Sequence, residues 1–205
     1  MSAEQIPSHL PISPACERNR EPILQVLREV LTAPGEVLEI GSGTGQHAVY
    51  FAEHLPWRDW HASDRPEYHD GIRAWMAHAG RSNLHGPWHL DVTQREWPLE
   101  QVADVFSANT AHIMHWPEVV SLFAGVGRIL PPAGSFCLYG PFQVAGRHRS
   151  NSNAQFDAQL RARDPGMGIR DRQDLEHLAK ENGLVLEEVH PLPANNDLLI
   201  WRRRP

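Results

Sequence analysis

Short apolar runs alternate along the chain with segments whose apolar residues recur at helical spacing. The runs that predict strands cover residues 36–40, 57–63, 86–90, 103–108, 135–139, 184–189 and 198–201. Helical spacing is clear between several of them, for example at Val119, Leu122 and Val126. Strands that alternate with helices predict an α/β sheet with crossover connections. A length of 205 residues fits one domain over 1–205.

The last two predicted strands differ from the others in how they are joined. Residues 190–196 connect them, and this connection is too short for a helical crossover. We therefore expect that pair to be antiparallel and the earlier strands to be parallel. The predicted fold is a Rossmann-like, seven-stranded sheet, mostly parallel with an antiparallel last strand, with helices on both faces.

Two segments break the alternation. Residues 1–20 hold three prolines and little periodicity, so we expect an irregular N-terminal arm and a helix that begins at Pro22, where proline suits the first turn. Residues 140–170 are polar, and so long a segment inside a domain is usually functional or mobile, which predicts a lid-like insertion. Asp171 then predicts the N-cap of a helix that ends near Gly183.

A glycine-rich turn follows the first predicted strand and precedes a helix. It reads Glu39-Ile-Gly-Ser-Gly-Thr-Gly45, with a G-x-G-x-G spacing that differs from the dinucleotide fingerprint G-x-G-x-x-G. Glycines leave no side chain between the backbone and a ligand. A carboxylate at Glu39 would face a pyrophosphate badly and would suit a ligand with an ammonium group and a sulfonium centre. These properties match S-adenosylmethionine, for which we expect contacts from Glu39, Gly41, Ser42, Gly43, Thr44 and Gly45.

Polar side chains also end the next three strands. Asp64 would bind the ribose hydroxyls, Asp91 the adenine amino group, and Asn109 the methionine part, because ligands of open parallel sheets bind at the carboxyl ends of the strands. Each residue also has a structural interpretation. Asp64 would cap the next helix, Asp91 would stabilise a turn, and Asn109 would satisfy backbone groups.

Composition narrows the choice of partners and compartment. The net charge is −6, from 19 basic and 25 acidic residues, which speaks against nucleic acid as the main partner. No apolar run approaches the roughly 20 residues that span a bilayer, and the two cysteines form no C-x-x-C. We expect a cytoplasmic protein with no membrane partner. The 13 histidines show no H-E-x-x-H spacing, so no metal site is predicted. The oligomeric state is left open.

Several stretches resemble a known family. Residues 39–45 look like the first motif of class I S-adenosylmethionine-dependent methyltransferases. More specifically, the chain resembles a small family, once catalogued as a domain of unknown function, that includes methyltransferase-like protein 26. The resemblance rests on residues 16–24, 39–47, 107–116, 139–142, 151–157, 168–171 and 193–196. It implies the seven-stranded methyltransferase fold and leaves the methyl acceptor open.

Candidate residues for catalysis follow from the expected position of the cofactor. His112 and Asn109 are the candidate catalytic residues. His112 lies three residues past Asn109 and is the candidate general base, because histidine titrates near neutral pH; its alternative is a structural histidine. Arg20 would meet the cofactor carboxylate. Contacts with a small polar substrate are expected from Asn19, Trp116, Tyr139, Asn151 and Asn153; Asn19 is also a possible helix cap.

Three functions remain open at this point. The first is methyl transfer from S-adenosylmethionine to a small molecule. The second is a module that binds this cofactor but has no methyltransferase activity of its own, since no catalytic dyad is obvious. The third is a nicotinamide-dependent oxidoreductase, which the glycine spacing and Glu39 speak against.

Overall fold

A seven-stranded sheet lies at the centre of the molecule, in the order β3-β2-β1-β4-β5-β9-β8. The computed structural model describes Pro7 and residues 10–205. The strands are β1 (Gly35–Ile40), β2 (Arg58–Asp64), β3 (Leu84–His89), β4 (Asp104–Ala108), β5 (Ser135–Gly140), β8 (Leu184–Leu192) and β9 (Asn196–Arg203). β9 pairs antiparallel with both β5 and β8, and the other pairs are parallel. The predicted fold class and the antiparallel final hairpin are confirmed.

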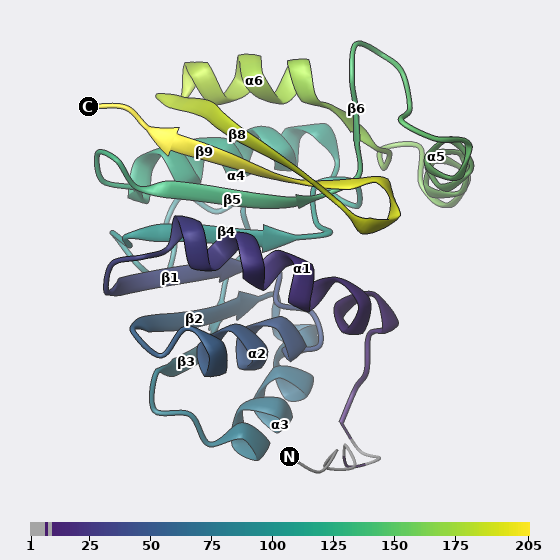
Figure 1. The fold of residues 1–205 in the computed structure, drawn as a ribbon. Coiled ribbons are helices and arrows are strands. Elements are labelled where there is room, and N and C mark those ends of the chain that lie inside the picture. Colours follow the sequence, from purple (N-terminus) through teal and green to yellow (C-terminus); the bar gives the residue numbers. More distant parts are fainter. Residues whose placement is uncertain (1–6, 8–9) are drawn as a thin grey trace.

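Helices cover both faces of this sheet (Figure 1). They are α1 (Pro14–Val30), α2 (Gln46–His54), α3 (His69–Ala79), α4 (Trp116–Ile129), α5 (Asn151–Arg163) and α6 (Arg172–Glu181). On one face α1 and α2 pack Leu24, Leu27 and Phe51 against Trp60 and Phe106 of the sheet. The opposite face carries α4 and α6, whose apolar sides form a second core.

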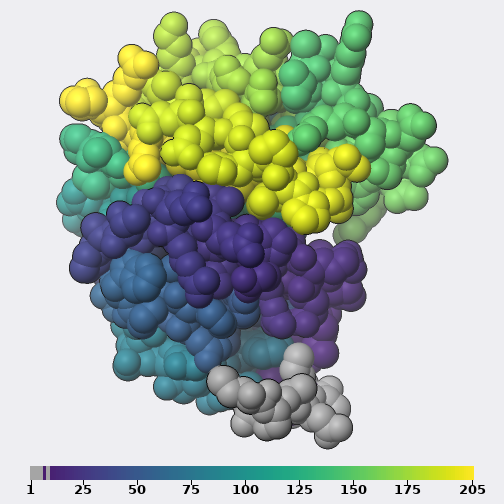
Figure 2. Space-filling model, in the orientation of Figure 1, coloured from purple at the N-terminus to yellow at the C-terminus, as the bar shows by residue number. Residues whose placement is uncertain are grey.

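The first helix begins eight residues earlier than the sequence predicts. Ser13 is its N-cap, with the side chain accepting a hydrogen bond from the Cys16 N–H, and Pro14 occupies the first turn. Pro22 lies inside the helix instead of starting it. The predicted irregular arm over 1–20 is therefore wrong from residue 14 onward, and its residues 1–6 and 8–9 lie outside the described part of the chain. Figure 2 shows α1, in purple, lying beside the C-terminal strands, in yellow.

Residues 140–170 are not an irregular loop. Two short strands, β6 (Phe142–Gln143) and β7 (Arg170–Asp171), pair in parallel and close the segment at its base. Between them, Ser150 caps α5 by accepting a hydrogen bond from the Asn153 N–H. The buried carboxylate of Asp157 accepts hydrogen bonds from the Arg161 side chain and the Ile169 N–H. These bonds hold α5 in place beyond the carboxyl ends of the strands (Figure 1).

The remaining elements follow the predicted pattern closely. Asp171 caps α6 as expected, accepting a hydrogen bond from the Gln173 N–H. Short 3-10 turns precede α3 (Pro66–Tyr68) and join β8 to β9 (Pro193–Asn195). None of the helices in the described part of the chain combines the length and the apolar character needed to cross a bilayer.

Candidate functional site

The glycine turn at residues 41–45 lies between β1 and α2 at the carboxyl edge of the sheet. Gly41 has a φ of 77°, and a Cβ atom there would lie 2.6 Å from Cγ2 of Thr110. Glycine is therefore required at this position for both backbone conformation and space. The N–H groups of Gly41 and Ser42 both donate to the carbonyl oxygen of Ser63 at 3.0 Å. These bonds fix the turn against the end of β2.

Asp64 faces the glycine turn from the end of β2. Its Oδ2 accepts a hydrogen bond from the Gly43 N–H at 2.8 Å, and its Oδ1 accepts one from the Arg65 N–H at 2.8 Å. Partial burial raises the pKa of this carboxyl, while the two backbone bonds oppose the shift. Each oxygen uses one lone pair here, so further acceptor capacity is available to a ligand.

Asp91 follows β3 and combines two roles. Its Oδ1 accepts hydrogen bonds from the N–H and the hydroxyl of Thr93, at 2.9 and 2.7 Å, and these bonds lower its pKa. The turn role that the sequence left open is thus present. The side chain also lines the same cleft as Asp64, together with the apolar Leu90 and Val92.

The turn after β4 brings Asn109 and His112 into the cleft. Asn109 adopts a left-handed φ of 59°, which asparagine tolerates, and its N–H donates to the carbonyl oxygen of Tyr139 at 2.9 Å. The His112 side chain is 6% exposed, and its ring meets Phe156 edge-on with centroids 5.3 Å apart. Burial, and then the charge of Arg170, lower the pKa of His112 to about 4. The imidazole is therefore neutral at pH 7.

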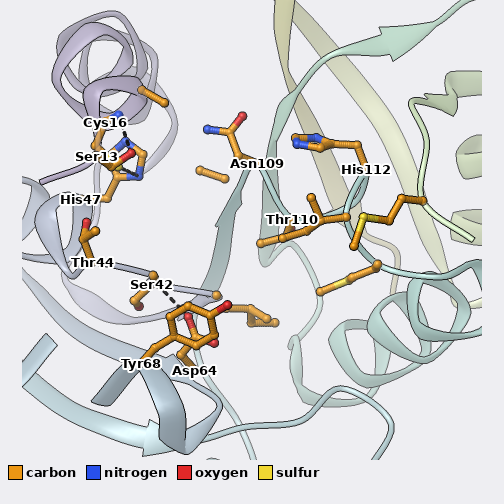
Figure 3. Close-up of a pocket in the computed structure, with 18 of the residues that line it drawn as sticks. Ser13, Cys16, Ser42, Thr44, His47, Asp64, Tyr68, Asn109, Thr110 and His112 are labelled. Carbon is orange, nitrogen blue, oxygen red and sulfur yellow. Dashed lines mark hydrogen bonds between the residues drawn. The ribbon is translucent and has the colours of Figure 1, made fainter. Parts of the chain in front are cut away.

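One cleft of about 1160 Å³ joins these groups. Figure 3 shows Asp64 and Tyr68 near one end, Asn109 and His112 on one side, and Ser13, Cys16 and His47 on the wall opposite. The predicted site residues that line it are Gly41, Ser42, Gly43, Thr44, Asp64, Asp91, Asn109, His112 and Asn153. The ends of four neighbouring strands thus contribute to one continuous cleft.

One known protein family matches nearly the whole chain. Residues 10–203 match the family described as "Protein of unknown function (DUF938)". The chain belongs to this family. The predicted resemblance to an uncharacterised family with the class I methyltransferase fold is confirmed.

Several solved methyltransferases share this fold. An O-methyltransferase family protein from Burkholderia thailandensis is 15% identical, with a TM-score of 0.81 over 93% of this chain and 57% of that one. The mitomycin 7-O-methyltransferase MmcR is 16% identical, with a TM-score of 0.78 over 90% and 54%. The S-adenosylmethionine-dependent methyltransferase SibL is 19% identical, with a TM-score of 0.77 over 93% and 56%. The chain spans little more than half the length of these neighbours, and at this identity they establish the shared fold.

Glu39 does not line the cleft, which corrects its expected placement. Residues 37 and 39 point to the face of the sheet covered by α1 and α2, so Glu39 is 1% exposed, and its Oε2 accepts a hydrogen bond from the indole N–H of Trp60 at 2.7 Å. Burial raises the pKa of this carboxyl to about 8. Glu39 is therefore largely protonated at pH 7 and offers no full charge to an ammonium group.

Arg20 and Asn19 are also placed differently from the prediction. Both belong to α1, and neither of them lines the cleft. Arg20 lies over the ring of Tyr50 and pairs with Glu17 at 3.1 Å. Asn19 is buried in the interior of α1, so it is no helix cap, and its Oδ1 accepts a hydrogen bond from His47.

Four further predicted residues lie outside the cleft lining. Tyr139 is buried, and its hydroxyl accepts a hydrogen bond from Asn196 at 2.9 Å, so the cleft is lined by Asn196 instead. Trp116 and Asn151 begin α4 and α5, where their side chains are exposed to solvent. Gly45 faces α3, since a Cβ there would lie 3.0 Å from the backbone of Ile72.

Several lining residues were not predicted. Cys16, Arg18 and His47 enter the cleft because α1 begins early and passes over the glycine turn. The Ser13-Pro14 pair, an N-cap followed by a proline in the first turn, was the sequence signal for that start. Tyr68 lies in the short turn after β2. No group of three or more His, Cys, Asp or Glu side chains in the described part of the chain has the arrangement of a metal site.

Proposed function

We propose that the protein transfers a methyl group from S-adenosylmethionine to a small molecule that enters the cleft beside His112. The observation that carries this proposal is the bond from the Gly43 N–H to the carboxylate of Asp64. It brings a glycine-rich turn and an acceptor for ribose hydroxyls to one point of the cleft.

The lining residues fit the adenosine half of this cofactor. Asp64 retains acceptor capacity on both oxygens, and Asp91 presents a second carboxylate nearby. Leu90 and Val92 provide an apolar wall for a purine, and the ring of Tyr68 lines the same end. A neutral nucleoside suits this combination of carboxylates and apolar surface better than a phosphate would.

The lining also fits the amino-acid half. Gly43 has open space around the position that a Cβ would take, so a ligand can approach the backbone there. Asn109 offers a carboxamide at the end of β4. Arg18 lines the cleft and takes over the carboxylate-binding role that the sequence assigned to Arg20.

When bound, this cofactor supplies a methyl group on a positively charged sulfur, which is already activated for displacement. The chain's own task is to orient the acceptor and to remove its proton. His112 would remove the proton of the acceptor, because its neutral imidazole lines the cleft next to Asn109 and has a free lone pair at pH 7.

The acceptor side of the cleft is more apolar than the sequence suggested. Beyond His112 the lining combines the apolar Met114, Phe156 and Met167 with the buried Asn153 and with the polar side chains of His115 and Asp164. This lining favours a small molecule with an apolar body and a polar group that reaches His112.

Calorimetry with S-adenosylhomocysteine, followed by a screen for methylated products against a panel of metabolites, tests the proposal. We expect binding, and with the correct acceptor a turnover that His112→Ala lowers far more than it lowers cofactor affinity. A rate unchanged by His112→Ala would remove the histidine from the mechanism. Tight NADH binding without S-adenosylhomocysteine binding would contradict the cofactor.

A second function is favoured by one observation. Neither ring nitrogen of His112 has a hydrogen-bond partner among the described residues, so no second group orients it as a base. A protein that binds the cofactor without transferring its methyl group would have such a site. Binding with no product from any acceptor tested would support this alternative.

A further inference from the structure

Three side chains on the wall opposite His112 form a connected row. Sγ of Cys16 lies 3.7 Å from Nδ1 of His47, and Nε2 of His47 lies 2.7 Å from Oδ1 of Asn19 (Figure 3 shows the first pair). Cys16 and His47 line the cleft, while His47 and Asn19 are only 4% and 7% exposed. The proposed methyl transfer uses none of the three.

The orientation of His47 follows from Asn19. An amide oxygen only accepts hydrogen bonds, so Nε2 of His47 carries the proton and Nδ1 presents its lone pair to the thiol. Burial raises the pKa of Tyr139, and the side chains of Asn196 and Asn19 oppose that shift, which places the Asn19 amide beside the phenol as well as beside His47. The imidazole is thus held in the tautomer that a base for Cys16 requires.

Burial keeps both members of this pair neutral at physiological pH. Burial raises the pKa of Cys16, while the hydroxyls of Ser13 and Thr44 oppose that shift. The carboxylate of Glu17 adds to it, as does that of Glu39 at the alkaline pH where Glu39 is ionised. Burial, and then the charge of Arg20, lower the pKa of His47 to about 4. A neutral thiol therefore faces a neutral imidazole throughout the physiological pH range. The thiol can react as a nucleophile only if His47 takes its proton during the attack.

We propose that Cys16 is a modification site for hydrogen peroxide, with His47 as its general base and Asn19 as the residue that positions His47. The sulfur attacks one peroxide oxygen, so that an S–O bond forms and the O–O bond breaks. The thiol proton passes to Nδ1 of His47 and then to the departing hydroxide, which leaves as water. The products are a sulfenic acid and one water molecule, and the peroxide is the oxidant.

The product would change the cleft where the cofactor is proposed to bind. Cys16 lies among Ser13 and Thr44 on the wall beside the glycine turn, so a sulfenic acid would add a polar group there. The reaction itself needs no cofactor. The proposed oxidation of Cys16 can therefore be tested independently of the proposed methyl transfer.

The pH dependence of alkylation tests the role of His47. With iodoacetamide, followed by peptide mass spectrometry, we expect the rate of Cys16 alkylation in the native protein to be nearly constant from pH 5 to 8. In His47→Gln only the thiolate reacts, so the rate should fall about tenfold per pH unit below the thiol pKa and recover at high pH. Cys137, which is fully buried, is the internal control and should label slowly unless the variant unfolds.

Two further measurements complete the test. Asn19→Ala should give a steeper profile than the native protein, and Asn19→Asp, which keeps an oxygen beside Nε2, should restore the flat one. After peroxide treatment, a cyclic 1,3-dione that traps sulfenic acids should label Cys16 and leave Cys137 unlabelled. The proposal is overturned if native Cys16 already loses reactivity tenfold per pH unit, if His47→Gln leaves the profile flat, or if no sulfenic acid is trapped.

Discussion

Arg170 donates a hydrogen bond from Nε to the carbonyl oxygen of Ala111, 3.0 Å away, and Ala111 directly precedes His112. The same guanidinium donates to the carbonyl oxygens of Met114 and, at 2.8 Å, Gly166. The Gly168 N–H in turn donates to the carbonyl oxygen of His112 at 2.9 Å. The end of the 140–170 segment therefore holds the turn that carries the candidate base.

Replacing Arg170 should disturb the position of His112 and leave cofactor binding intact. In Arg170→Gln the carbonyl oxygens lose their donors, so we expect turnover to fall about tenfold to a hundredfold while affinity for S-adenosylhomocysteine changes little. The free energy of unfolding should fall by about 1–2 kcal/mol, because partly buried carbonyls lose a charged donor. Arg163→Gln, on the exposed side of α5, is the matched control. Equal losses of turnover in both variants would contradict the role of Arg170.

Asp64 should contribute strongly to the affinity for the cofactor. Asp64→Asn replaces one acceptor oxygen with an NH₂ group that faces the Gly43 N–H or the ribose, so we expect calorimetry to show S-adenosylhomocysteine binding weakened by about 10- to 100-fold. Asp70→Asn changes the same charge on the exposed side of α3 and should leave the affinity unchanged. Binding that survives in Asp64→Asn would mean that the nucleoside lies elsewhere.

Much of the sheet was predictable because each strand has a local signal. Buried runs between turn residues mark β1, β2, β4 and β5, and the short connection at 190–196 forces the antiparallel final pair. The same logic placed Asp64 and Asp91 at strand ends that meet at one edge. It could not place the start of α1, because Pro22 in an interior turn imitates a first-turn proline.

Side-chain direction was harder to predict than backbone position. Glu39 precedes the glycine turn, as expected. Because side chains alternate along a strand, its carboxyl points to Trp60 on the face of the sheet that α1 and α2 cover, and not into the cleft. The row of Cys16, His47 and Asn19 depends on how α1 packs over α2, which no local pattern encodes. Arg170 is a comparable case, since its partners are backbone oxygens of a turn distant in the sequence.

Burial of Glu39 predicts a stability that falls as pH rises. The pKa of this carboxyl is raised from 4.5 to about 8 in the folded protein, so between these pH values the folded chain keeps a proton that the unfolded chain has released. The free energy of unfolding should therefore lose up to about 1.4 kcal/mol per pH unit from this group. Glu39→Gln should remove this loss, so that its advantage over the native protein grows from pH 4.5 to 8. Urea titrations measure it, with Glu29→Gln on the exposed side of α1 as control.

The buried histidines predict the opposite slope at acid pH. The pKa values of His47 and His112 are lowered from 6.5 to about 4, mainly by burial, so the unfolded chain binds protons that the folded chain excludes between these values. Each histidine should thus remove up to about 1.4 kcal/mol from the free energy of unfolding per pH unit as pH falls from 6.5 to 4. The variants His47→Gln and His112→Gln test each contribution separately.

The difference between each variant and the native protein isolates one histidine, because the opposing effect of Glu39 is common to both and cancels. We expect that difference to shift in favour of the variant as pH falls from 6.5, and to level off near pH 4. His78→Gln, on the exposed side of α3, should give a curve parallel to that of the native protein. If His112→Gln were also parallel, the pKa of His112 would be the same in the folded and the unfolded chain, which would contradict the buried, neutral imidazole on which the proposed methyl transfer rests.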